Sequence, residues 1–339
     1  MKCTIFYLII GLIFGGCKGS NSVSISEVSE VSGVSAQECS STAGVYASAF
    51  NHDSAYRFVV EQLAFGQRVP GSKAHRECAL YMAGRLRDFA DTVFVQEFSA
   101  RRWDGAALRG SNIIASFNPS ASQRVFLCAH WDSRPYADNE NDEALHRRSI
   151  DGANDGASGV GVLLEIARVL SLSAAVSVGV DIVLFDLEDS GKPRFEQTQY
   201  GDEKTWCLGS QYWAANPHVA GYRASYGILL DMVGVRNATF KQEGTSLHYA
   251  PDIMAKVWKT ASALGYGRYF VYEQATPIID DHLFINQIAG IPTIDIIALD
   301  GNTPHGFFPH WHTLQDNIEN IDKQTLKMVG DVVLKTINN

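Results

Sequence analysis

Residues 124–129, with the sequence RVFLCA, form a nearly continuous apolar run that is followed directly by His130. Such a run is typical of a strand that is buried on both faces of a sheet. Residues 156–172, GASGVGVLLEIARVLSL, place apolar side chains at helical spacing, and residues 180–187, VDIVLFDL, repeat the buried-strand pattern. A strand, a helix and a second strand in this order predict a parallel βαβ unit.

The flanking segments continue the alternation of strands and helices. We expect strands at 92–98, 110–117, 225–232 and 291–298, and helices at 54–66, 73–89, 208–215, 251–264, 282–288 and 322–337. This pattern predicts a single-domain α/β fold with a mostly parallel, twisted central sheet and helices on both faces. No internal repeat or second-domain boundary interrupts it.

The N-terminus has the features of a targeting segment. Lys2 precedes an apolar stretch from Ile5 to Phe14, which is too short for a stable membrane span, and Gly15, Gly16 and Cys17 resemble a bacterial lipobox. We therefore expect a lipoprotein signal peptide at 1–16, a lipidated Cys17 with a flexible tether at 17–38, and a catalytic domain at 39–339. We expect the protein to lie in the periplasm, anchored to a bacterial membrane by the lipidated Cys17. An ordinary signal peptide with an incidental Cys17 is the alternative.

The charge and the cysteines restrict the partners. The formal net charge of −9 argues against nucleic acid, which requires a basic surface. Nothing in the sequence indicates an obligate oligomer, so we expect a monomer. Beyond Cys17, the remaining cysteines match no cysteine-type zinc site, and Cys128 is expected to be a buried apolar residue. Spacing alone leaves open whether Cys39 and Cys78 form a disulfide.

Acidic and imidazole side chains follow the predicted strands and occupy the later loops. The carboxyl ends of parallel strands are where sites form in such sheets. Buried carboxylates are costly unless they are paired or bound to a metal, and zinc accepts both carboxylate and imidazole ligands. A free carboxylate next to such a zinc serves as a general acid or base. The residues concerned are His130, Asp132, Asp155, Glu188, Asp189, Asp231, Asp280, Asp281, His282, His310 and His312.

Four segments of the sequence resemble motifs of the M28 zinc aminopeptidase superfamily. They are the His-x-Asp at 130–132, the run GANDGASG at 152–159, the acidic pair Glu188–Asp189, and Trp-His-Thr at 311–313. The resemblance extends from about residue 68 to the C-terminal helix. It implies the α/β fold of that superfamily and a zinc enzyme that acts on the N-terminal end of peptides.

Within that superfamily, four features resemble the bacterial glutaminyl cyclases. They are Asp280-Asp281-His282, Trp311 before His312, the segment WCLGSQYW at 206–213, and Asp189 as the second acidic residue of its pair. The resemblance implies conversion of the N-terminal Gln of peptides or proteins to pyroglutamate with release of ammonia, at one zinc per chain. The alternatives are a two-zinc aminopeptidase and a non-catalytic lipoprotein that serves as a binding module.

The resemblance also implies roles for individual residues. The zinc ligands would be Asp155, Asp189 and His312; the catalytic residues would be Glu188 as proton shuttle with Asp231 and Asp280; and Trp311, Trp206 and Asp280 would contact the substrate. His130, Asp132 and His282 would orient these groups. Because His130 and Asp231 match the second metal position of the peptidases, two-metal chemistry stays open. We expect His305 and His310 at the pocket rim, and the long polar loop between Asp189 and Trp206 beside the site.

Overall fold

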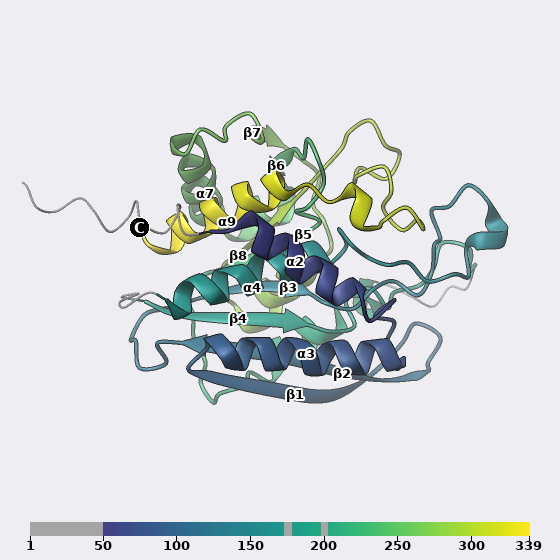
Figure 1. Cartoon of the computed structure of the whole chain (residues 1–339), viewed down its shortest axis with the longest axis horizontal. Helices are drawn as coiled ribbons and strands as arrows, with labels where there is room; N and C mark the ends of the chain where they lie inside the picture. Colours follow the sequence, from purple (N-terminus) through teal and green to yellow (C-terminus); the bar gives the residue numbers. More distant parts are fainter. Residues whose placement is uncertain (1–49, 173–177, 198–202) are drawn as a thin grey trace, which may run out of the picture. The chain divides into compact units, whose positions relative to one another are not determined.

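The computed structural model describes residues 50–172, 178–197 and 203–339. Figure 1 shows how their helices and strands are arranged. The predicted signal peptide, Cys17 with its tether, and Cys39 lie outside the described residues. Within the described parts of the chain, no helix combines the length and the apolar character needed to cross a bilayer.

A six-stranded sheet forms the centre of the domain, in the order β1-β2-β4-β3-β5-β8. Four neighbouring strands, β4, β3, β5 and β8, run parallel, whereas β1 and β2 are antiparallel additions at one edge. This confirms the prediction of a mostly parallel sheet. The strands are β1 Thr92–Arg101, β2 Ala107–Phe117, β3 Arg124–His130, β4 Gly179–Phe185, β5 Gly227–Asp231 and β8 Thr293–Ile297.

Helices cover both faces of this sheet, as predicted. Two consecutive residues of β3 point to opposite faces. Leu127 belongs to the larger apolar cluster with α2, α3, α4, α7 and α9, and Cys128 belongs to a smaller cluster on the other face with Trp213 of α5. The helices are α2 His52–Leu63, α3 Lys73–Phe89, α4 Ala157–Ser171, α5 Leu208–Ala215, α6 Gly244–Tyr249, α7 Pro251–Ala263, α8 Asp281–Phe284 and α9 Lys323–Ile337.

Local sequence explains where the long helices begin and which side they bury. The Ser72 hydroxyl accepts a hydrogen bond from the His75 N–H at the start of α3, which satisfies one of the free donors of the first turn. Cys78, Met82 and Leu86, spaced four residues apart, then form the buried stripe of this helix.

The predicted boundaries differ from the structure at one point that matters for the site. The strand expected at 180–187 ends at Phe185. At Leu187 the chain turns with a positive φ of 59°, and the Leu187 N–H donates to the Asp186 carboxylate (2.8 Å). The sequence analysis also missed β6 (Phe240–Gln242), β7 (Phe270–Gln274) and the short α6. The helix expected at 282–288 is a short α-helix that continues as a π-helical turn at 285–289.

Candidate active site

The carboxyl ends of β3, β4 and β5 open onto a cavity of about 590 Å³. All the residues expected to be catalytic, zinc-binding or substrate-binding line it, whereas His130, Asp132 and His282 do not. Those lining it are Asp155, Glu188, Asp189, Trp206, Asp231, Asp280, Trp311 and His312; Met232, Ile297, His305, Phe307 and residues 276–279 complete the lining.

The three expected zinc ligands come together from three separate loops. His312 Nε2 lies 3.5 Å from Asp155 Oδ2 and 3.3 Å from Asp189 Oδ1. Ligand atoms held about 2.0–2.1 Å from a tetrahedral zinc are separated by roughly 3.3 Å, so this spacing fits the metal. The other oxygen of Asp189, Oδ2, is buried without a hydrogen-bond partner. A bound metal ion would explain why this buried carboxylate oxygen has no hydrogen-bond donor.

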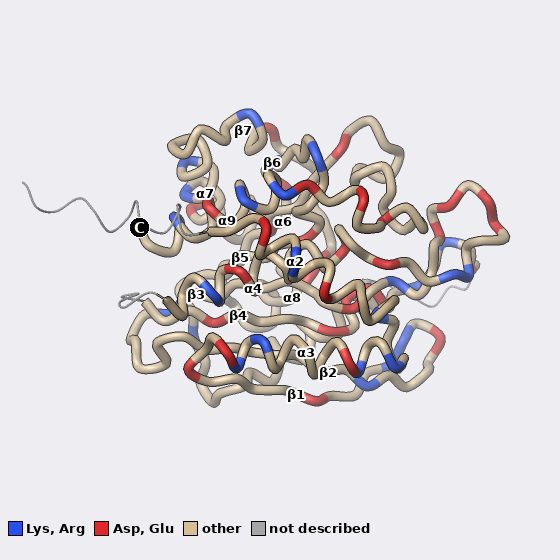
Figure 2. Tube along the Cα trace, viewed as in Figure 1, with Lys and Arg blue, Asp and Glu red and all other residues tan. Residues whose placement is uncertain are grey.

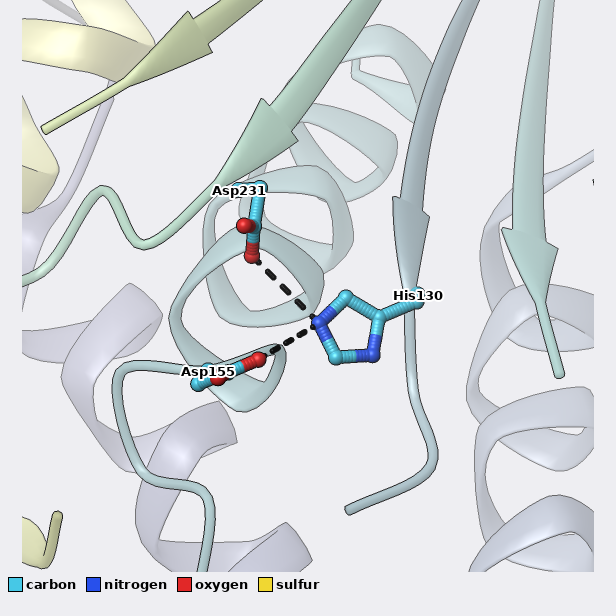
Figure 3. A group of neighbouring side chains, drawn as sticks. All are labelled: His130, Asp155 and Asp231. Atoms are coloured by element: carbon cyan, nitrogen blue, oxygen red, sulfur yellow. Dashed lines mark ion pairs between the residues drawn. The ribbon is translucent and has the colours of Figure 1, made fainter. Parts of the chain in front are cut away.

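A second cluster shares Asp155 with the first. His130 Nε2 lies 3.0 Å from Asp155 Oδ1 and 3.3 Å from Asp231 Oδ1 (Figure 3). Asp155 therefore presents one oxygen to His130 and the other to His312. The geometry offers two adjacent cation positions with Asp155 between them.

The close approach of α4 to β3 depends on glycine. Gly156 follows Asp155 and directly precedes α4. A Cβ at this position would clash with the carbonyl oxygen and the imidazole of His130. Only glycine therefore lets the loop bring Asp155 against the end of β3.

Asp132 orients the loop that carries the acidic pair. Its carboxylate accepts hydrogen bonds from the backbone N–H groups of Glu188 (3.1 Å) and Asp189 (3.3 Å). The same carboxylate lies 3.4 Å from His130 Nδ1. It thus fixes the positions of three neighbouring site residues without lining the cavity.

Arg134 and Asp138 are site residues that the sequence analysis missed. The fully buried Arg134 guanidinium donates two hydrogen bonds to Asp138 (2.9 and 2.8 Å) and one to the Asp189 carboxylate (3.3 Å). Asp138 Oδ1 lies 3.3 Å from His312 Nδ1. Burial opposes ionisation of Asp138, but the hydrogen bonds from Arg134 and His312 hold its pKa below the usual range. The pair lies in a loop without periodicity, so no local pattern pointed to it.

Two tryptophans flank the proposed ligand His312. The Trp311 ring lies 3.9 Å from the imidazole, and the Trp206 ring lies nearly parallel to it at 6.3 Å. Trp206 also stacks on the Arg134 guanidinium (4.6 Å), and Phe307 packs on Trp311 (4.6 Å). The aromatic side chains thus form one wall of the cavity.

The site also contains a group of carboxyls whose pKa values are raised. Burial raises the pKa of Asp231 to about 6, and burial together with the Asp231 charge raises that of Asp280 to about 7. Burial and the Asp280 charge raise the pKa of Asp281 to about 8. Burial also raises the pKa of Glu188 well above its ordinary value. These groups are poised to hold and move protons near neutral pH.

His282 contacts a separate group of buried acidic residues. Its Nε2 is 3.1 Å from Glu243 Oε1, and it groups with Asp280 and Asp295 rather than with the three proposed zinc ligands. Asp295 projects from β8 with both carboxylate oxygens buried and without hydrogen-bond partners. The sequence analysis gave no role to Glu243 or Asp295, because neither follows a recognisable motif.

The expected rim residues divide between two places. His305 and Phe307 line the cavity, whereas His310 faces a separate hollow beside Phe308 and Asp300. Of the long polar loop, residues 198–202 lie outside the described residues. Trp206, just after that loop, borders the cavity. The cysteines Cys78, Cys128 and Cys207 are buried free thiols, which confirms the expectation for Cys128.

Comparisons with known proteins agree with this architecture. The solved glutaminyl cyclase of Bacteroides thetaiotaomicron is 52% identical, with a TM-score of 0.83 over 86% of this chain and 98% of that chain. A Zn-dependent exopeptidase from Parabacteroides distasonis ATCC 8503 is 50% identical, with the same TM-score and coverage. Glutaminyl-peptide cyclotransferase of Bothrops jararaca is 25% identical over 297 residues, which span 79% of this chain and 76% of the relative. The model of peptidase family M28 matches residues 112–337. The chain therefore belongs to peptidase family M28.

Proposed function

We propose that this protein is a zinc-dependent glutaminyl-peptide cyclotransferase that converts the N-terminal Gln of peptides and proteins to pyroglutamate. The observation that carries the proposal is the position of Glu188. Its carboxylate lines the cavity beside the Asp155–Asp189–His312 group without belonging to it, and Asp280 lines the same cavity. The 52% identity to a glutaminyl cyclase supports this assignment.

In the proposed reaction the α-amine of the substrate attacks the γ-carboxamide carbon of its own side chain. A new C–N bond closes the lactam ring, and the bond to the amide nitrogen breaks to release ammonia. A zinc held by Asp155, Asp189 and His312 would supply a Lewis acid for the carboxamide oxygen. Because both reacting groups belong to one residue, holding them in the correct orientation contributes much of the rate.

The side chains of the cavity perform the proton transfers. Glu188 accepts a proton from the attacking amine and delivers it to the departing nitrogen. Asp280, with its pKa raised to about 7, hydrogen-bonds the leaving nitrogen and is backed by Asp231. Trp206 and Trp311 fold the substrate side chain and exclude water, which the reaction does not consume.

We propose one zinc per chain. His130 Nε2 lies within ion-pairing distance of both Asp155 and Asp231. The imidazole can therefore offset the charge of these carboxylates, and no second metal ion is needed there. The same cluster favours a second candidate, a two-zinc aminopeptidase in which His130 and Asp231 bind the second metal. The 50% identity to a Zn-dependent exopeptidase supports this second candidate.

One assay separates the two candidates. Peptides that begin with Gln-Ala are incubated with the purified protein, and ammonia, product mass and bound zinc are measured in one sample. A product lighter by one ammonia, with about one zinc per chain, supports the cyclotransferase. Release of free amino acid with nearer two metals per chain identifies an aminopeptidase instead.

The proposal includes a periplasmic location, with the protein anchored to a bacterial membrane through a lipidated Cys17. The lipobox-like Gly15-Gly16-Cys17 supports it. We further propose a monomer that binds peptide substrates and no nucleic acid. Acidic and basic residues are interspersed along the described chain, as Figure 2 shows, rather than separated into a basic surface.

A further inference from the structure

Cys207 is joined to the loop that carries Glu188 at the start of α5. The Cys207 N–H donates to the Glu188 carbonyl (2.9 Å), and the Leu208 N–H donates to the Leu187 carbonyl (3.1 Å). Cys207 and Leu187 both have positive φ angles, 54° and 59°, so two turns face each other here. The backbone at 207–208 therefore holds the backbone at 187–188 in register.

The side chains of the same two residues also meet. Cys207 Sγ lies 3.3 Å from Glu188 Oε1, and the thiol is fully buried. In the described parts of the chain, no other side chain donates a hydrogen bond to the Glu188 carboxylate. Burial and the nearby Glu188 charge raise the pKa of Cys207 well above its ordinary value. The sulfur keeps its proton and acts as the donor.

We propose that Cys207 is a positioning residue for the proposed cyclisation, whose thiol donates to Glu188 Oε1 and holds the carboxylate in one orientation. The inference rests on the proposed function, because Glu188 matters here as the proton shuttle. A glutamate has several rotatable bonds, and a free carboxylate would sample orientations that do not reach the substrate amine. With Oε1 held by the thiol, Oε2 is left for the proton transfer.

The test compares Cys207→Ala, which removes the donor, with Cys207→Ser, which keeps a donor of similar size. Cys128→Ala is the matched control, since Cys128 is also fully buried but its sulfur faces the Ile228 carbonyl (3.8 Å) on β5. For Cys207→Ala we expect kcat to fall about tenfold, within the ~10²-fold that a misplaced catalytic group costs. KM and zinc content stay unchanged. Cys207→Ser restores most of kcat, and Cys128→Ala keeps it.

Several results would overturn the inference. They are a wild-type kcat in Cys207→Ala, a Cys207→Ser variant as slow as the alanine variant, or an equal loss in Cys128→Ala. If Cys207→Ala does not fold, infrared spectra of the wild-type protein and Glu188→Ala decide. An S–H stretching band that shifts when the charged acceptor is removed supports the contact, and identical bands refute it.

The proposed function fails by a different result, namely a wild-type protein that releases no ammonia from glutaminyl peptides. If that protein instead releases amino acids, the same kcat comparison on hydrolysis tests the contact between Cys207 and Glu188. An active cyclotransferase whose kcat is indifferent to Cys207 overturns only the present inference.

Discussion

Arg134 holds Asp189 by two hydrogen bonds, one to its backbone carbonyl (3.0 Å) and one to carboxylate Oδ1 (3.3 Å). Oδ2 of the same carboxylate is left buried and unpartnered, and is thus available to a metal. Through Asp138, the same guanidinium also supports His312. Two of the three proposed zinc ligands therefore depend on one buried ion pair.

Arg134→Lys is expected to weaken zinc binding by about 10–100-fold, as loss of a group that orients metal ligands typically does. Lysine keeps the charge but cannot make the forked contacts to Asp138 and Asp189 together. Competition with a chromogenic chelator measures the affinity. Arg124→Lys is the control, because Arg124 forms a similar two-bond pair with Asp181 away from the cavity. Equal zinc affinity in both variants would contradict the supporting role.

Glu188→Gln should lower kcat by roughly 10²–10⁴-fold, the usual contribution of a positioned general acid or base. The amide has similar size but cannot accept and deliver the proton. Zinc content should stay at the wild-type value, because Glu188 is not one of the proposed ligands. Steady-state kinetics and metal analysis on the same preparation check both statements. A fully active variant would remove Glu188 from the mechanism.

His312→Ala should lose zinc and activity together, because a catalytic zinc has only three protein ligands to begin with. His305→Ala serves as the comparison, since His305 lines the same cavity without joining the ligand group. Metal analysis after dialysis against a weak chelator distinguishes the two variants. Zinc retained in the His312 variant at the wild-type amount would show that the metal is bound elsewhere.

Asp281→Asn should reduce the loss of stability that the metal-free protein suffers as pH rises. In the folded protein, burial and the Asp280 charge raise the pKa of Asp281 from 3.8 to about 8. The folded state therefore holds a proton that the unfolded chain loses, and the stabilisation present below about pH 4 declines until about pH 8.

Thermal unfolding of the chelated wild-type and Asp281→Asn proteins measures this effect. We expect the Tm of the variant to fall by several degrees less between pH 5 and pH 8, because its side chain at position 281 has no proton to lose on unfolding. Parallel Tm curves for the two proteins would show that Asp281 does not titrate in this range.

Cys17→Ala is expected to move the protein from the membrane fraction to the soluble fraction of the cell envelope. The proposed lipid chains on Cys17 would supply the anchor, since no helix of the described residues is long and apolar enough to cross a membrane. Fractionation with immunodetection measures the distribution, and Cys78→Ala, which changes a buried cysteine of α3, is the control. An unchanged membrane fraction for Cys17→Ala would mean that the anchor is not this residue.

Much of the fold was predictable because its signals are local. The apolar run of β3, the helical spacing in α4 and the four-residue stripe of α3 each lie within one element, and their bounds agree with the structure to within one residue. The misplaced end of β4 had a non-local cause: the Asp186 N–H donates to the Asn112 side chain of the neighbouring strand β2. The short β6, α6 and β7 carried too few residues for periodicity to appear.

The sequence by itself determined which chemical groups stand at the ends of the strands, because a parallel sheet sends every strand end to the same edge. The resemblance to the M28 superfamily then implied that Asp155, Asp189 and His312 hold zinc beside Glu188. Only the tertiary structure decided what holds them. Arg134 reaches Asp189 across 55 residues, and Cys207 reaches Glu188 across 19. Such contacts follow from how separate loops pack in three dimensions, which leaves no periodic trace in the chain.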